Sequence, residues 1–244
     1  MLKAPWSSSG RGLQKITKAP VHEAVWQRVN SIIKDQGFVM AEPYFRGQMD
    51  FAFEFSALKG EICYLGTSIF RTDSKGQYQG NFLNGPGNQL PEKVYAFFRK
   101  HSENLIDWLK IHLEISGLTK FYEGMLGIDG LVYMDSENQL RINPVLEINL
   151  RYTMGIVALN LEKYVGAESH GLFNLYYQPG KGFSVFAAEM TMVHPLVFRD
   201  NKIYSGFFPL TDFDEDSWFG AYLMIEKENG CITNPYAAVA ITNI

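Results

Sequence analysis

The sequence predicts an α+β fold, in which helices and strands are mixed without a regular βαβ alternation. Residues 21–36 and 92–116 carry apolar side chains at helical spacing. Residues 50–58 alternate instead, with Phe51, Phe53 and Phe55 on one face of a strand. We find no internal repeat and no low-complexity linker, so the two patterns belong to one mixed architecture.

The two helices are expected to be amphipathic. Pro20 suits the first turn of the helix over 21–36, and Gly37 suits its C-terminal stop. The helix over 92–116 has an apolar stripe formed by Val94, Phe97, Phe98, Leu105, Trp108, Leu109 and Leu113. A shorter helix is expected over 153–165.

The remaining segments are predicted to be strands and loops. We expect a short buried strand at 38–40, a strand at 61–70 that returns from 50–58, and a loop at 74–91 rich in Gly, Asn, Gln and Pro. Two strands at 124–134 and 140–149 are joined by the turn 135–139. Beyond residue 170 the pattern is one of strands and turns, with strands at 192–198 and 218–226.

Composition narrows the function classes. The chain has 244 residues, 46% apolar and 20% charged, which is ordinary for a globular protein, and its net charge of −4 gives no basic field for nucleic acid. No apolar run approaches the roughly 20 residues of a membrane span. Cys63 and Cys231 lack metal-site spacing, so we expect buried free thiols and a cytoplasmic protein that binds neither nucleic acid nor membrane.

The segment from 124 to 151 holds the most informative group of polar residues. If the hairpin is centred on Asn138, Asp129 lies opposite Glu147. Residues two apart on a strand share a face, so Glu147, Asn149 and Arg151 project together. Carboxylate and carboxamide oxygens suit Mg²⁺, and a guanidinium suits phosphate or carboxylate. On spacing alone, the solvated polar face of a strand pair explains the same pattern.

A second feature lies at the N-terminus. Lys3 precedes a loop of small residues, Ser7, Ser8, Ser9, Gly10, Arg11 and Gly12. Glycine lets backbone N–H groups approach phosphates, and serine hydroxyls add donors. Lys3 adds a point charge. A plain mobile N-terminal loop is the alternative.

A third feature is the extended connector formed by Glu42, Pro43, Tyr44 and Phe45. Such a connector can present backbone N–H and C=O groups to the edge of a purine, between apolar walls. Asp50, just beyond, can accept hydrogen bonds from ribose hydroxyls. An ordinary loop between strands is the alternative.

The order of these pieces over about residues 1–160 resembles the ATP-grasp superfamily, which includes biotin carboxylase and D-alanine–D-alanine ligase. The run from Glu147 to Arg151 resembles its Glu-x-Asn-x-Arg metal motif, and Asp129 matches its upstream acidic ligand. Lys3 matches the lysine that contacts ATP phosphates, and residues 7–12 resemble the loop that closes over them. Residues 42–45 resemble the adenine hinge, and Asp50 the ribose contact.

The resemblance implies two α+β subdomains that hold ATP between them, with Mg²⁺ or Mn²⁺. It assigns residues 1–70 to the small subdomain, 71–165 to the large subdomain with the metal site, and 166–244 to a β-rich extension. Arg151 and Lys3 are the expected catalytic cations. Arg71 is a third candidate, aimed at the γ-phosphate, with a surface arginine as the alternative. Pro144 implies a bulge or an edge position in the hairpin.

The implied activity is that of an ATP-dependent ligase, which activates a carboxylate as an acyl phosphate for attack by an amine or a thiol. The carboxylate belongs to a small molecule or a peptide. The family's earlier phosphate-binding lysine and N-terminal substrate domain have no counterpart in this sequence. We therefore expect either that such a domain lies outside this chain or that the chain is a catalytically inactive nucleotide-binding or interaction module.

Overall fold

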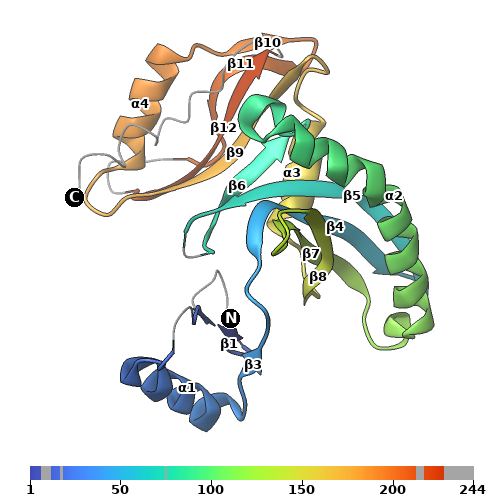
Figure 1. Cartoon of the computed structure of the whole chain (residues 1–244). Coiled ribbons are helices and arrows are strands. Elements are labelled where there is room, and N and C mark those ends of the chain that lie inside the picture. The colour runs from blue at the N-terminus through green and yellow to red at the C-terminus, as the bar shows by residue number, and fades with distance from the viewer. Residues whose placement is uncertain (7–11, 17–18, 75, 213–216, 228–244) are drawn as a thin grey trace.

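The computed structural model describes residues 1–6, 12–16, 19–74, 76–212 and 217–227. They form an α+β structure, as predicted, with a small three-stranded sheet and a large nine-stranded sheet (Figure 1). Every paired strand in both sheets is antiparallel to its neighbours.

The N-terminal unit consists of the small sheet and one helix. Its strands are β1 (Leu2–Lys3), β2 (Leu13–Gln14) and β3 (Met40–Ala41), in the order β2-β1-β3. Helix α1 (Glu23–Gln36) starts where His22 Nδ1 accepts a hydrogen bond from the Ala24 N–H, at 3.2 Å, so Pro20 precedes the cap rather than forming the first turn. Gly37 ends the helix as predicted, because its φ of 89° favours glycine.

The expected buried strand at 38–40 is wrong in its burial. The strand is β3, on the outer side of the three-stranded sheet, and both of its residues are exposed. Phe38 leads into it with 55% of its surface exposed. A two-residue edge strand has too few neighbours to cover apolar side chains.

The large sheet has the strand order β10-β11-β12-β9-β6-β5-β4-β7-β8. Its strands are β4 (Arg46–Leu58), β5 (Glu61–Thr72), β6 (Tyr78–Leu83), β7 (Gly124–Met134), β8 (Leu140–Asn149), β9 (Ser169–Tyr177), β10 (Val197–Arg199), β11 (Lys202–Pro209) and β12 (Phe219–Lys227). The helices that accompany it are α2 (Glu92–Ile115), α3 (Met154–Glu162) and α4 (Phe183–Val193), with short 3₁₀ turns at Gly87–Gln89 and Leu118–Lys120.

Two elements differ from the sequence prediction. Strand β6 lies within the expected loop at 74–91, because pairing with β5 and β9 on both sides overrides its Gly- and Asn-containing sequence. Helix α4 replaces the expected strands and turns, and the strand at 192–198 shrinks to β10. The α4 sequence is apolar on most sides and no side chain caps its start, so it lacks the usual helix signals.

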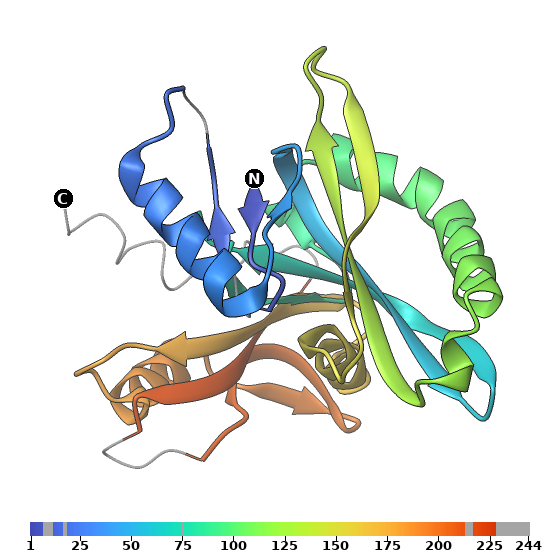
Figure 2. The ribbon, with the colours of Figure 1, turned by 90° about the horizontal axis from the view of Figure 1, so that it is seen from below.

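The two faces of the large sheet pack against different helices (Figures 1 and 2). On the face that we call the α2 face, α2 and α4 cover one apolar core. Phe51 of β4 lies there with its ring centroid 4.6 Å from that of Phe98 in α2. Burying such a side chain contributes about 1.5–3 kcal/mol. On the opposite α3 face, α3 packs against a second cluster that includes Leu83 and Phe173.

The sheet also bears on the expected division of the chain. Strand β5 runs through the expected boundary at 70/71, and β9 to β12 extend the sheet that begins with β4.

Cys63 is a free and exposed thiol, contrary to the expected burial, while Cys231 lies outside the described residues. Within the described residues, none of the helices has the length and apolar character that crossing a membrane requires.

Candidate functional site

The hairpin of β7 and β8 brings the predicted metal-binding residues together. Asp129 pairs with Glu147, and Gly127 pairs with Asn149, as the sequence predicts. Paired residues of neighbouring strands point to the same side of the sheet. Asp129, Glu147 and Asn149 therefore share the α3 face.

Pro144 lies where the hairpin departs from regular pairing. Leu131 pairs with Asn143, but Asp129 pairs with Glu147, so the stretch between the two pairs is longer on β8 than on β7. Strand β8 is also the last strand of the sheet. Both expectations for Pro144, a bulge and an edge strand, are confirmed, since a proline needs no partner for its nitrogen there.

A chain of side-chain hydrogen bonds links three of the four residues. Asn149 Nδ2 donates to Asp129 Oδ2 at 3.1 Å, and Arg151 Nη2 donates to Asn149 Oδ1 at 2.8 Å. Asn149 is buried and Asp129 half-buried, whereas Glu147 and Arg151 are exposed. The group therefore extends from the interior of the sheet to solvent, so a charged ligand can reach its exposed members.

Glu54 is a further acidic residue of this site that the sequence analysis did not single out. It lies on β4, pairs with Gly127, and is 0% exposed. Its Oε1 accepts a hydrogen bond from Ser68 Oγ at 3.0 Å, and its Oε2 accepts one from Thr153 Oγ1 at 2.8 Å. Its position opposite the phenylalanine face of β4 was visible in the alternation, but its two hydroxyl partners come from distant segments.

Two glycines make room for the Glu54 carboxylate. A Cβ atom at Gly127 would lie 2.7 Å from Glu54 Oε2, and one at Gly155 would lie 1.9 Å from Oε1. Thr153 also caps α3, because its hydroxyl accepts the Ile156 N–H at 3.2 Å. The carboxylate thus sits at the N-terminus of α3, where the helix dipole favours negative charge.

Negative charge accumulates on the α3 face. Burial, and then the charges of Glu147 and Glu54, raise the pKa of Asp129 to about 7, although Asn149 and Arg151 oppose this. Burial also raises the pKa of Glu54, against the hydrogen bonds from Thr153 and Ser68. Carboxylates that repel one another in this way are stabilised when a divalent cation lies between them.

The donor set fits Mg²⁺ in one particular manner. Among the described residues, no group of three His, Cys, Asp or Glu side chains is arranged to hold a metal ion by itself. Mg²⁺ is usually held by one or two carboxylates, with phosphate oxygens and waters completing its octahedron. Asp129 and Glu147, with the Asn149 carboxamide, match this pattern rather than that of a closed protein cage.

The α3 face stays polar further along β4, β5 and β6. Asp50 accepts a hydrogen bond from Thr72 Oγ1 at 2.9 Å, and the Tyr78 hydroxyl donates to Asn81 Oδ1. Burial raises the pKa of Asp50, an effect that the Thr72 bond opposes, and burial also raises the pKa of Tyr78. Asp50 therefore lies on the same face as Glu54 but at another part of the strand.

Arg71 is not brought to this group. Strand alternation places it beside Ile69, on the α2 face. Its Nη2 donates to Asn174 Oδ1 of β9 at 2.9 Å. Its partner and its face are thus both different from those of Asp129.

The candidate nucleotide contacts of the N-terminus lie in the N-terminal unit. Lys3 Nζ forms an ion pair with Glu42 at 2.6 Å, and the Met1 ammonium donates to the Glu42 carbonyl at 2.7 Å. The Gly12 carbonyl accepts the Ala4 N–H at 3.0 Å. Residues 7–11, which include Ser7, Ser8, Ser9, Gly10 and Arg11, lie outside the described residues.

The connector from Glu42 to Phe45 is irregular and joins β3 to β4, as predicted. Tyr44 is 50% exposed, and Lys15 Nζ lies 3.5 Å from the centroid of its ring. Phe45 packs on Tyr133 of β7, with ring centroids 4.2 Å apart. The connector therefore offers two aromatic rings and an exposed Pro43, whereas the Glu42 N–H and carbonyl are hydrogen-bonded to Met1 and the Phe45 carbonyl accepts the Gly47 N–H.

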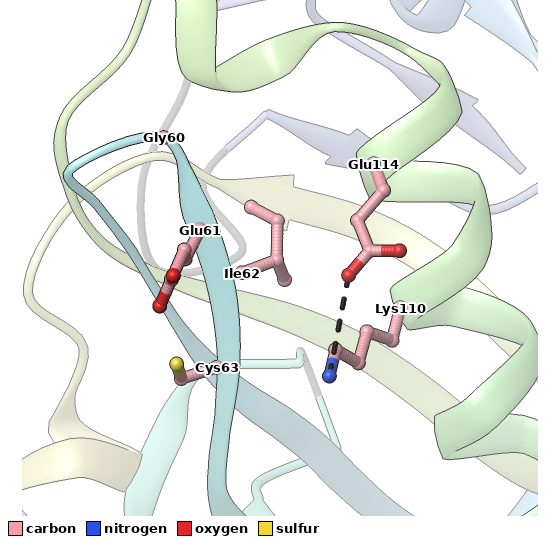
Figure 3. A pocket seen from close by; sticks show the side chains of 6 residues that line it. All are labelled: Gly60, Glu61, Ile62, Cys63, Lys110 and Glu114. Atoms are coloured by element: carbon pink, nitrogen blue, oxygen red, sulfur yellow. Dashed lines mark ion pairs between the residues drawn. The ribbon is translucent and has the colours of Figure 1, made fainter.

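A hollow of about 270 Å³ lies elsewhere, between the β4–β5 turn and α2 (Figure 3). Its lining residues are Gly60, Glu61, Ile62, Cys63, Lys110 and Glu114. Lys110 and Glu114 of α2 form an ion pair there, with their charged atoms 4.0 Å apart, drawn as the dashed line in Figure 3. None of the candidate site residues lines this hollow.

No protein-family model matches the sequence, and no curated protein matches it. Among solved structures, the chain is similar to a biotin carboxylase–βγ-ATP complex from Campylobacter jejuni, with a TM-score of 0.54 and 14% identity over 93% of this chain and 53% of that chain. It is also similar to Rhizobium etli pyruvate carboxylase T882A with acetyl coenzyme A, with a TM-score of 0.52 and 14% identity over 93% of this chain and 22% of that chain.

These likenesses define the class of fold. The chain has an ATP-grasp fold, as the resemblance in the sequence predicted. It spans about half the length of the biotin carboxylase that it matches, at 53% of that chain. At 14% identity the likeness concerns the fold alone, so the chemistry must be argued from the site.

Proposed function

We propose that the chain is the ATP- and Mg²⁺-binding part of a ligase that activates a carboxylate as an acyl phosphate. The observation that carries the proposal is the shared face of Asp129, Glu147 and Asn149, with Arg151 bonded to the last of them. The ATP-grasp fold supplies the context, since the similar Campylobacter jejuni biotin carboxylase is described as a complex with βγ-ATP.

Asp129, Glu147 and Asn149 would hold the cation, Mg²⁺ or Mn²⁺. When bound, it supplies charge neutralisation for the phosphates of ATP. Glu54, fixed by Ser68 and Thr153, keeps a further negative charge beside this group without being exposed itself.

The nucleotide would be held by the N-terminal unit, by the connector that follows it and by β4 of the large sheet. We assign adenine to the connector Glu42, Pro43, Tyr44 and Phe45, the ribose to Asp50, and the phosphates to Lys3 and to the loop containing Ser7, Ser8, Ser9, Gly10 and Gly12. Because Lys3 is paired with Glu42, binding of phosphate would have to exchange one anionic partner of Lys3 for another.

The reaction requires no protein nucleophile. A substrate carboxylate oxygen attacks the γ-phosphorus of ATP, the bond to the β–γ bridging oxygen breaks, and ADP leaves. Arg151 and Lys3 would stabilise the charge on the transferring group. An amine nitrogen, or a thiol, then attacks the acyl carbon, loses its proton and displaces inorganic phosphate.

A second function, that of an inactive nucleotide-binding or interaction module, is favoured by one observation. The ammonium of Lys3 is already neutralised by Glu42 at 2.6 Å. An assay of carboxylate-dependent ADP release, with a mixture of amino acids as acceptors, separates the two functions. Release above the carboxylate-free rate supports the ligase, and nucleotide binding without release supports the module.

The binding site is tested by calorimetric titration of the whole chain with ATP, with and without Mg²⁺. We expect Mg²⁺ to tighten ATP binding at least tenfold, and the variant Glu147→Ala/Asn149→Ala to lose this dependence. The matched control is Glu137→Ala, which removes an exposed carboxylate from the turn of the same hairpin. Equal Mg²⁺ dependence in the double variant would refute the assignment.

A further inference from the structure

A polar row crosses the α2 face of the sheet through four neighbouring strands. Arg71 of β5 pairs with Gly80 of β6, Gly80 pairs with Asn174 of β9, and Asn174 pairs with Tyr222 of β12. Paired residues on adjacent strands point to the same side, so the three side chains and the glycine form one line. This row lies on the face opposite Asp129.

Gly80 is what allows Arg71 to reach Asn174. With no side chain on β6, the guanidinium spans the gap, and its Nη2 donates to Asn174 Oδ1 at 2.9 Å. A Cβ atom at Gly80 would lie 2.2 Å from the Phe173 carbonyl oxygen and 2.7 Å from Asn174 Oδ1. The φ of Gly80, 151°, also disfavours other residues.

The row has more hydrogen-bond donors than acceptors. Arg71 Nε and Asn174 Nδ2 are both buried and have no hydrogen-bond partner in the described part of the chain. Asn174 is only 2% exposed, while Arg71 is half-buried. No ion pair joins Arg71 to a carboxylate among the described residues. Buried donors of this kind in a folded protein call for an acceptor, and a buried cation calls for an anion.

The surroundings restrict the class of anion. The row is bordered on the same face by apolar side chains of the main core, Phe82, Leu172 and Tyr176. Arg71 is the single cation of the row, and its planar fork matches two oxygens in one plane. A monoanionic carboxylate on a short apolar body suits these features better than a phosphate, which carries more charge and needs more donors.

We infer that Arg71 and Asn174 form a binding site for a small organic carboxylate on the α2 face. The guanidinium would donate to the carboxylate oxygens, and the Asn174 amide would add one further donor. This site is separate from the proposed metal and nucleotide site and does not depend on it.

The test is thermal unfolding of the whole chain in sodium acetate and in sodium chloride at equal ionic strength. A ligand that binds only the folded state raises the melting temperature in a saturable manner. We expect acetate to raise it by about 3–6 °C at tenfold the dissociation constant. Phosphate also stabilises folded proteins nonspecifically, because it is excluded from their surface. The specific effect is therefore the part of the shift that Arg71→Gln removes, and this part should be smaller for sodium phosphate than for sodium acetate.

Three variants complete the test. Arg71→Gln should lose the acetate effect. Asn174→Asp should also lose it, because the new carboxylate pairs with Arg71 in place of acetate. This internal pair should also raise the melting temperature of Asn174→Asp in sodium chloride. Arg99→Gln, which removes an exposed arginine of α2, should keep the effect. If Arg71→Gln does not fold, Asn174→Asp decides. The inference would be overturned by an acetate effect that persists in Arg71→Gln or Asn174→Asp, or that is absent from the unmodified chain. It would also be overturned if the part of the salt effect that depends on Arg71 were larger for phosphate than for acetate.

Discussion

The two faces of the large sheet hold different charged groups at the two sites described above. The α3 face gathers the carboxylates of Glu54, Asp129 and Glu147, whereas the α2 face holds the guanidinium of Arg71. Strands β4 and β5 serve both faces, because successive side chains of a strand alternate. A register shift of one residue would exchange the faces, so the aromatic core beneath α2 also fixes where the acidic group lies.

The comparison also shows two ways of keeping a buried charge. Glu54 has two hydroxyl donors and a helix N-terminus, all supplied by the protein. Arg71 has a single amide oxygen. We therefore interpret the Glu54 group as a completed structural support for the site, and the Arg71 group as one that an external anion completes.

Replacing Glu54 by alanine should have the largest effect on stability. The change leaves the Ser68 and Thr153 hydroxyls buried without their acceptor, and we expect the free energy of unfolding to fall by about 2–4 kcal/mol. Urea unfolding followed by circular dichroism measures it. Glu61→Ala, at an exposed position of β5, is the control and should change stability by less than about 0.5 kcal/mol. A loss below about 1 kcal/mol in Glu54→Ala would mean that the carboxylate is not a support.

Gly155→Ala should have the next largest effect. The new Cβ would lie 1.9 Å from Glu54 Oε1 and 2.3 Å from Ser68 Oγ, so the carboxylate must leave its seat. We expect a loss of about 1–3 kcal/mol in the same urea experiment. Gly47→Ala is the matched control, since its Cβ meets only the flexible end of Leu131, at 3.0 Å. Equal losses at the two positions would show that the packing around the Glu54 carboxylate tolerates an added methyl group as well as the surroundings of Gly47 do.

The smallest effect expected is on the pH dependence of stability. Burial raises the pKa of Glu54 in the folded state, so the folded protein holds this proton more tightly than the unfolded chain. Its contribution is complete below the unfolded pKa and is lost as the pH rises through the folded pKa. Glu54→Gln cannot titrate, so the stability of the unmodified protein relative to this variant should fall as the pH rises from 4 to 7. A difference that is constant, or that rises with pH, would contradict the raised pKa.

The sequence predicted the parts of the site that lie within one segment. The hairpin from 124 to 149 was recognisable because both strands and their turn are contiguous, and centring it on Asn138 gave the pair of Asp129 and Glu147 correctly. The tip of the hairpin in fact pairs Met134 with Leu140, which places its centre at Glu137. The bulge near Pro144 then shifts the register of the pairing, so that Asp129 lies opposite Glu147. The prediction of this pair was therefore correct partly because the bulge compensates for the misplaced centre of the hairpin.

The features that the sequence did not predict depend on contacts between distant segments. Glu54 meets Thr153 across 99 residues, and Arg71 meets Asn174 across 103 residues. Nothing local in β6 indicated a strand, since its place is fixed by two neighbours that are far apart in the chain. Periodicity in the sequence indicates which face of the sheet a residue occupies, but not which hydrogen-bond partners from distant segments lie on that face.

The most direct test of the account is a count of bound Mn²⁺, used in place of Mg²⁺, by electron paramagnetic resonance. We predict that the whole chain with saturating ADP binds one Mn²⁺ per molecule, and that Asp129→Asn weakens this binding by at least tenfold while Glu137→Gln leaves it unchanged. Undiminished Mn²⁺ binding by Asp129→Asn, or no nucleotide-dependent Mn²⁺ binding by the unmodified chain, would contradict the claim that the α3 face holds a metal–nucleotide complex.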